Sequence, residues 1–336
     1  MKIIYFLLLV VISCKPLQLV KNAQTVVLEK TSIRAIHVQN DTLWFAGSAG
    51  KMGWINFERN EKAIYKNQFT EAELRSASFY NTTFYVLNVA NPAQIVGLSN
   101  LGVQKNYYSE KNEKVFYDSM YIDAKGFGAA IGDPTSTCLS VLVTTNGGAE
   151  WQKIPCEQLP EVMEGEAAFA ASNTNVKLID NTIFIVSGGK KSRLFKSIDK
   201  GKTWNVFDTP IIQGKQMTGA FSMDFYDSKV GMLVGGNYED QQNNEANKAI
   251  TFDGGKTWKL VANKEAFGYA SCVQFVPRKK GNELFVCGTS GVYFSKDFGV
   301  TWKKILDDND YYTLRIKDSK TLFLAGKNKV TKLTLN

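Results

Sequence analysis

Short runs of alternating apolar and polar residues recur along the whole chain and predict β-strands throughout. A typical unit has three such runs separated by turns, as in IRAIHV, TLWFAG and MGWINF between Ile33 and Phe57. A period of two is typical of strands, and no long stretch has the period of an amphipathic helix. Similar units begin at seven places, namely Ile33, Leu74, Ser119, Ala167, Gly219, Ala270 and Tyr312.

A second pattern follows the third strand of the later units. S/T-x-D-x-G-x-T-W occurs as SIDKGKTW, TFDGGKTW and SKDFGVTW, and TTNGGAEW is a weaker copy. The Asp or Asn accepts backbone hydrogen bonds in its own turn, the Gly adopts a positive φ, and the indole covers a hairpin. These copies resemble the Asp-box, or BNR, repeat of sialidase-like β-propellers. Their key positions are Asn146 and Trp151; Asp199, Gly201 and Trp204; Asp253, Gly255 and Trp258; and Asp297, Gly299 and Trp302.

The spacing of the boxes predicts propeller blades. The Asn or Asp falls at positions 146, 199, 253 and 297, and periods of about 40–50 residues are typical of four-stranded blades. We therefore predict an all-β, seven-bladed propeller over residues 25–336. The last unit shows three strands, so TVVLEK from Thr25 is expected to complete it and close the ring. Six or eight blades follow if the first two units, whose boxes have decayed, are misassigned.

The amino terminus has the pattern of an export signal. Met1-Lys2 precedes ten apolar residues and then Ser13-Cys14, and this apolar run is too short to span a bilayer. Val11 to Cys14 resembles a bacterial lipobox, which predicts a signal peptide over residues 1–13, lipidation of Cys14 and a tether over 14–24. Lys15 favours the outer membrane as the destination. The alternative is an ordinary signal peptide with an incidental Cys.

Export makes disulfides plausible for the four remaining cysteines. Cys138 and Cys156 lie symmetrically about the turn near Gly147, and Cys272 and Cys287 flank a predicted hairpin loop. We expect the bonds Cys138–Cys156 and Cys272–Cys287, and the alternative is four buried thiols.

Composition excludes several classes of function. The formal net charge is +8, or +7 once Lys2 is removed, and the lysines are spread over most units. This indicates a solvated basic surface, with attraction to an anionic membrane or polysaccharide as the alternative. No nucleic-acid module, cofactor motif or metal site is expected, because His37 is the only His and no G-x-G-x-x-G joins a strand to a helix.

Candidate ligand-binding residues lie in the loops on the face opposite the boxes. In the predicted blades, the boxes occupy the turns between strands three and four, whereas the loop after strand two and the connection to the next unit lie on the other face. These loops carry Asp133, Glu164, Glu166, Arg193, Tyr238 and Tyr269. The alternative is that they are ordinary polar turns.

Three arginines form a second candidate site. Arg34, Arg75 and Arg315 occupy similar positions in the first strands of units one, two and seven, which are neighbours if the ring closes. Guanidinium groups bind carboxylate and phosphate in a bidentate manner. The alternative is that each Arg pairs with a local acidic residue.

Taken in order, SIRAIHVQNDTLWFAGSAGKM, ELRSASF, GDP, EGEAAFAAS and VGGNYED resemble bacterial relatives of the photosystem II stability/assembly factor-like propellers. That resemblance covers nearly all of the predicted mature chain. It implies seven blades, a scaffold role in assembling partner proteins, and an arginine patch matched by Arg34 and Arg75. The sequence departs from the pattern at Ala270, where relatives tend to have an Arg after Gly-Tyr.

Two functions follow from these patterns. The preferred one is a non-catalytic propeller at the cell envelope that binds a protein or glycan. The alternative is a sialidase-like glycoside hydrolase, with the three arginines on a carboxylate, Asp133 and Glu166 as carboxyl groups, and Tyr238 or Tyr269 as the nucleophile. The F/Y-R-I-P motif of the first sialidase blade is absent, because Ala35-Ile36 follows Arg34.

Overall fold

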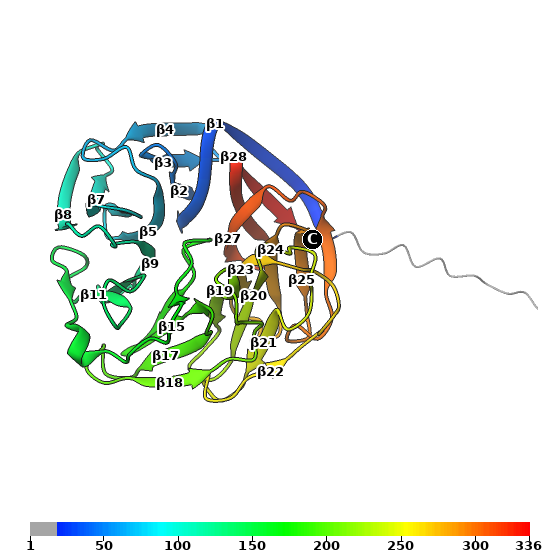
Figure 1. The fold of residues 1–336 in the computed structure, drawn as a ribbon. Coiled ribbons are helices and arrows are strands. Elements are labelled where there is room, and N and C mark those ends of the chain that lie inside the picture. The colour runs from blue at the N-terminus through cyan, green and yellow to red at the C-terminus, as the bar shows by residue number, and fades with distance from the viewer. Residues whose placement is uncertain (1–18) are drawn as a thin grey trace, which may run out of the picture.

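The structure, a computed structural model, describes residues 19–336 and is a ring of antiparallel β-sheets around a central axis (Figure 1). The predicted signal peptide and Cys14 lie outside the described residues. Within residues 19–336, no helix is long and apolar enough to cross a membrane.

Six hydrogen-bonded sheets make up the ring. The first contains, in spatial order, β27 (Tyr311–Asp318), β28 (Thr321–Leu335), β1 (Val20–Gln39), β2 (Thr42–Gly47), β3 (Lys51–Asn56) and β4 (Glu61–Lys66). The second contains β5 (Leu74–Tyr80), β6 (Thr83–Asn88), β7 (Ala93–Ser99) and β8 (Gln104–Glu110). The third contains β9 (Tyr117–Ile122), β10 (Gly128–Gly132), β11 (Ser140–Thr144) and β12 (Gln152–Lys153).

The other three sheets follow in chain order. The fourth contains β14 (Val176–Ile179), β15 (Thr182–Val186), β17 (Arg193–Ser197) and β18 (Asn205–Asp208). The fifth contains β13 (Glu166–Ala167), β16 (Gly188–Gly189), β19 (Thr218–Phe225), β20 (Gly231–Asn237), β21 (Lys248–Thr251) and β22 (Lys259–Leu260). The sixth contains β23 (Ala270–Phe275), β24 (Leu284–Gly288), β25 (Gly291–Ser295) and β26 (Lys303–Leu306), and one 3₁₀ helix, η1 (Cys156–Gln158), follows β12.

The prediction of seven blades is wrong, because the described strands form a six-bladed propeller. The difference arises at the closure of the ring. Residues 20–32 of β1 pair with β28, and residues 33–39 of the same strand pair with β2. One continuous strand therefore joins the segments expected to form the first and last blades into a single six-stranded sheet.

The amino-terminal strand begins earlier than expected. β1 starts at Val20 rather than Thr25, and Val20 pairs with Leu335 at the carboxyl terminus. Residues 21–25 are exposed and show no apolar alternation, so the sequence pattern gives no strand signal there. Backbone hydrogen bonding to β28 extends the strand over residues that the prediction assigned to the tether.

Apolar side chains of adjacent sheets pack against each other to form the core. One cluster joins Phe127 and Ile131 of the third unit to Ile183 and Phe195 of the fourth. Similar clusters lie between other neighbouring sheets. The apolar side chains of each sheet are therefore buried against the neighbouring blades.

Candidate functional site

The Asp-boxes form rigid turns on one face of the ring. In the box at Asp199, the Thr203 N–H and hydroxyl donate to the carboxylate at 2.8 and 2.7 Å, and the Gly201 N–H donates to Ser197 Oγ at 2.8 Å. The hydrogen bonds from Thr203 lower the pKa of Asp199 to about 2. The Trp204 indole N–H donates to the Gly201 carbonyl at 3.1 Å. The side-chain oxygens of Ser197, Asp199 and Thr203 thus all form hydrogen bonds within their own turn.

The box tryptophans pack into the interfaces between sheets. Trp258 contacts Phe225 at a ring separation of 6.0 Å, and Trp302 contacts Phe267 at 5.1 Å. The weaker box has the same turn, with Asn146 Oδ1 accepting from the Glu150 N–H at 3.0 Å. Its Trp151 indole nitrogen is buried without a hydrogen-bond partner. The four boxes therefore hold the blades together.

A short segment crosses the central axis and closes the channel. Residues 171–175 are here called the axial segment, and the first two of them were expected to end the inner strand of unit four, AAFAAS, over residues 167–172. Instead the inner strand of the fourth sheet is β14, which begins at Val176, and the axial segment runs across the channel. Its hydrogen-bond partners on the other inner strands are Arg34, Ala77, Ser119, Met120, Ser222, Met223, Ser271, Thr313 and Arg315.

Asn173 is the central residue of this closure. It adopts a positive φ of 59°, its amide nitrogen donates to the Ala77 carbonyl at 2.7 Å, and its amide oxygen accepts from the Met120 N–H at 2.8 Å. Asn tolerates the left-handed conformation better than most residues. The channel therefore has two separate mouths, one on the box face and one opposite.

All the described inner strands except β14 carry a β-bulge at one shared position near the mouth opposite the boxes. In β1 the register shifts between Ile33 and Ala35, so Arg34 is the extra residue, and Arg75 is the extra residue of β5. Bulges re-aim the side chain of the inserted residue. The corresponding residues of the other inner strands are Asp118, Phe221, Ser271 and Tyr312.

This register corrects the expected arginine site. Tyr312, not Arg315, is the residue of β27 that corresponds to Arg34 and Arg75. Arg315 instead donates to the Leu314 carbonyl at 2.7 Å and to the Ser172 and Asn173 carbonyls at 3.3 and 3.2 Å. It also lines a 240 Å³ pocket in the box-face mouth. The sequence does not indicate that Tyr312 takes this position, because a bulge shifts the register of a strand without changing its apolar pattern.

Aromatic rings surround Arg34 at the mouth opposite the boxes. We call this set the mouth cluster; its members are Arg34, Phe169, Phe221, Tyr238, Tyr269 and Tyr312. The Arg34 guanidinium lies 4.4 Å from the centre of the Tyr312 ring, and Tyr238 meets Tyr269 edge-on at 5.1 Å. Burial raises the pKa of Tyr269, whereas 40% of Tyr238 is exposed.

Arg34 has unused hydrogen-bonding capacity. One terminal nitrogen donates to the Ala171 carbonyl at 3.2 Å, and its buried Nε has no partner. No Asp or Glu within residues 19–336 forms an ion pair with Arg34, whereas Arg75 is paired with Glu73. The mouth therefore presents one uncompensated guanidinium on an aromatic wall.

Two carboxyl groups lie beside the mouth cluster. Asp118 is fully buried, and burial followed by repulsion from Asp133 raises its pKa well above the usual value. The Ala170 N–H moderates that rise, although neither Asp118 oxygen has a hydrogen bond of good geometry. Burial raises the pKa of Asp133 to about 6, while Asp133 accepts from the Ala168 N–H at 2.9 Å.

The raised pKa of Asp133 makes stability depend on pH. The folded pKa lies above the unfolded one, so this group's contribution is fully present below about pH 4 and is lost as the pH rises through about 6. We expect the Asp133→Asn variant to remove about 2–3 kcal/mol of the fall in stability between pH 4 and pH 7. Urea unfolding at both pH values measures it, and identical pH profiles for both proteins would contradict it.

The remaining predicted loop residues serve structural contacts. Glu166 is buried and accepts from Arg193 Nε at 3.0 and 3.1 Å and from Ser187 Oγ at 2.5 Å. Glu164 is exposed and pairs with Lys190. Glu164, Glu166 and Arg193 therefore have structural roles outside the mouth cluster. Of the predicted site residues, only Arg34, Tyr238 and Tyr269 belong to that cluster.

The glycosidase arrangement is not assembled. Arg315 is bound to backbone carbonyls and Arg75 to Glu73, so Arg34, Arg75 and Arg315 do not form one carboxylate-binding triad. Glu166 is held by Arg193, and Tyr269 is buried. Among residues 19–336, no group of three or more His, Cys, Asp or Glu could hold a metal ion.

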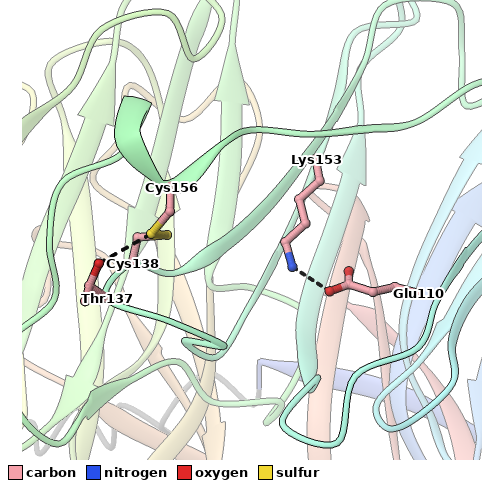
Figure 2. Close-up of a disulfide and its surroundings, with 5 residues drawn as sticks. All are labelled: Glu110, Thr137, Cys138, Lys153 and Cys156. Atoms are coloured by element: carbon pink, nitrogen blue, oxygen red, sulfur yellow. Dashed lines mark hydrogen bonds and ion pairs between the residues drawn. A yellow bond between two sulfur atoms is a disulfide. The ribbon is translucent and has the colours of Figure 1, made fainter.

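The four described cysteines differ in state. Cys138 and Cys156 form a disulfide that ties the start of β11 to η1, close to the Lys153–Glu110 ion pair (Figure 2). Cys272 and Cys287 are directly opposite each other on β23 and β24, yet both are buried free thiols. The second predicted bond is thus absent from the structure, where the Cys272 thiol donates to the Leu314 carbonyl at 3.8 Å and accepts from Arg315 at 3.9 Å.

Sequence reasoning missed much of the mouth cluster. Phe169, Phe221 and Tyr312 resemble ordinary core residues, and Asp118 resembles a polar strand position. Asp118, Phe221 and Tyr312 share one signal, since each occupies the bulge position near the start of its inner strand, whereas Phe169 lies outside the strands. The axial segment left a weaker trace, in the small residues Ala170-Ala171-Ser172.

Comparison with known proteins supports the architecture. The BNR/Asp-box repeat model matches residues 249–260, which contain one box. A structure of YCF48 bound to a D1 peptide has a TM-score of 0.64 at 12% identity, covering 96% of this chain and 100% of that chain. YCF48 from Cyanidioschyzon merolae has the same TM-score and identity, covering 93% of this chain and 98% of that one. The RRP9 WD40 repeats reach 0.68 at 9% identity, covering 96% and 100%.

The search of curated proteins gave no match. At these identities, the similar structures show the propeller fold, and the matched repeat shows that this propeller carries BNR/Asp-boxes.

Proposed function

We propose that this BNR/Asp-box propeller is a non-catalytic binding protein that holds an acidic segment of a partner protein at the mouth cluster. The observation that carries the proposal is the Arg34 guanidinium, which lies 4.4 Å over Tyr312 and has no carboxylate partner in residues 19–336. A carboxylate of the partner would complete this half-satisfied cation. The exposed ring of Tyr238 would take an adjacent apolar side chain.

The closed channel favours a surface-bound segment over a threaded one. The axial segment blocks passage at Asn173, so the mouth is a shallow floor rather than a tunnel. The structural similarity to YCF48 bound to a D1 peptide is consistent with a peptide ligand. A glycan at this mouth is disfavoured, since the exposed groups are a cation and rings rather than paired amide donors and acceptors.

We place this binding at the cell envelope. The support is the signal-like start, the resemblance of Val11 to Cys14 to a lipobox, and the Cys138–Cys156 disulfide, which suits an oxidising compartment. A Cys14→Ser variant should move from the membrane fraction to the soluble fraction. Unchanged fractionation would remove the lipid anchor from the proposal.

A pull-down from envelope extracts tests the mouth. We expect the Arg34→Ala plus Tyr238→Ala variant to recover at least about tenfold less partner than the wild type, because both the cation and the exposed ring are lost. Arg278→Ala is the matched control, since it removes the same charge at an exposed turn on the box face. Equal recovery by the double variant and the control would contradict the proposal.

A further inference from the structure

Four inter-sheet junctions are filled on the box face by an indole from the later unit. Trp151 packs beside Tyr85, and Trp258 packs in a cluster with Phe184. Trp204 and Trp302 occupy the corresponding places in their own clusters. Where the ring closes, Phe57 of the β3–β4 turn takes this role and lies 5.7 Å from Phe323. Each of these junctions is therefore sealed by an aromatic ring from a strand three–strand four turn.

The second unit lacks such a ring. Its β7–β8 turn consists of residues 100–103, and Asn100 follows β7 as Phe57 follows β3. Leu101 and Val103 point away from the junction and are 90% and 65% exposed. A groove of about 330 Å³ remains between the first two units at this place. The loss of the box has thus left a cavity at a place where the five junctions described above each hold an aromatic ring.

The floor of this groove is aromatic. Trp44, Trp54 and Phe79 line it, and Trp44 lies 5.2 Å from Phe79. Trp54 is partly exposed on the floor, so part of an indole faces solvent. Exposed ring faces attract the C–H surfaces of ligands that also carry polar groups.

The rim of the groove is made of amides. Asn40, Asn81 and Asn100 come from three different turns, are exposed, and make no side-chain hydrogen bond within residues 19–336. Each amide can donate and accept at the same time. The one charged residue of the lining, Arg59, is paired with Glu61 at 2.9 Å. The groove therefore offers paired donors and acceptors without uncompensated charge.

We propose that this groove is a binding site for a neutral saccharide. Sugar rings present apolar C–H faces that suit Trp54 and Phe79, and hydroxyls that both donate and accept, which suits the three amides. The volume lies at the lower end of the range of about 300–1,000 Å³ for ligand pockets. That size corresponds to one or two sugar rings. The site is on the box face, so it is independent of the mouth cluster.

Tryptophan fluorescence of the full chain tests the site with four neutral disaccharides, namely cellobiose, maltose, lactose and N,N′-diacetylchitobiose, and with glucuronate for comparison. We expect saturable quenching by at least one neutral sugar and weaker binding of glucuronate. Asn100→Phe should restore the seal made elsewhere by Phe57, and should lower the affinity at least about tenfold while the melting temperature is kept or raised.

Two further variants make the result decisive. Leu101→Phe adds the same ring one residue later on the exposed side of the turn, and should leave the affinity within about twofold. Asn81→Ala removes one rim amide without touching the core, and should weaken binding about threefold to tenfold. The proposal is overturned if none of the four neutral sugars binds, if glucuronate binds as tightly, or if the folded Asn100→Phe and Asn81→Ala proteins bind like the wild type.

Discussion

Replacing Glu166 by Ala should lower the free energy of unfolding by about 3–5 kcal/mol, because it leaves the Arg193 guanidinium without its carboxylate partner in a largely buried site. The side chains of Arg193 and Glu166 are 14% and 0% exposed. Glu166 also accepts from the Met163 N–H at 2.8 Å and the Ser187 hydroxyl at 2.5 Å. Urea unfolding followed by circular dichroism measures the change.

Glu164→Ala is the matched control for this experiment. Glu164 is only two positions away and pairs with Lys190 at 2.9 Å, but its side chain is 91% exposed. An exposed ion pair contributes about 0–1 kcal/mol. If both variants lost the same small amount, Glu166 would not hold the connection between the fourth and fifth sheets as its contacts indicate.

Asn173→Ala should cost about 3–5 kcal/mol and should weaken partner binding at the mouth. The change leaves the Ala77 carbonyl and the Met120 N–H without their side-chain partner at the axis, and each buried unpaired group costs about 1–3 kcal/mol. It also places Ala at a φ of 59°, which adds about 1 kcal/mol. Thermal or urea unfolding gives the stability, and the pull-down gives the binding.

Asn60→Ala separates the two causes. Asn60 has a φ of 53° but is exposed in a surface turn and makes no side-chain hydrogen bond within the described chain. It should therefore show the cost of the left-handed conformation alone. A loss at Asn173 no larger than that at Asn60 would mean that the axial segment is not held by the amide of Asn173.

These two sites explain how a closed propeller presents a binding surface. Glu166 and Arg193 fix the chain just before the axial segment, and Asn173 fixes the segment itself. Arg34 then donates to the Ala171 carbonyl on that fixed floor. Buried polar contacts, rather than surface loops, therefore hold the residues of the mouth cluster in position.

Several parts of the fold follow from local chemistry and could be predicted. The box turns need only Asp, Thr and Gly at fixed spacing, since their hydrogen bonds stay within eight residues. The pairing of Val26 with Val330 was also expected, because an open ring would leave unpaired edges. The number of blades could not be predicted in this way, because one strand can belong to two repeat units and so join their sheets into one.

The candidate site was predicted less well, for a physical reason. Arg34 and Arg75 share a register that the sequence indicates, but a bulge places Tyr312 rather than Arg315 at the third position. Cys138 and Cys156 are bonded, whereas Cys272 and Cys287, which are closer in sequence, stay as free thiols. A bulge or a side-chain orientation leaves no mark on an alternation of apolar residues.

By itself, the sequence determined an all-β ring of repeated hairpins with structural Asp-boxes, because strand alternation and turn chemistry act over a few residues. Only the tertiary structure decided that six sheets form, that residues 171–175 close the axis, and which side chains meet at the mouth. Those outcomes depend on contacts between residues that are far apart in the chain, such as Asn173 with Ala77 or Arg34 with Tyr312. Their energies come from the packed ring as a whole, so no local pattern encodes them.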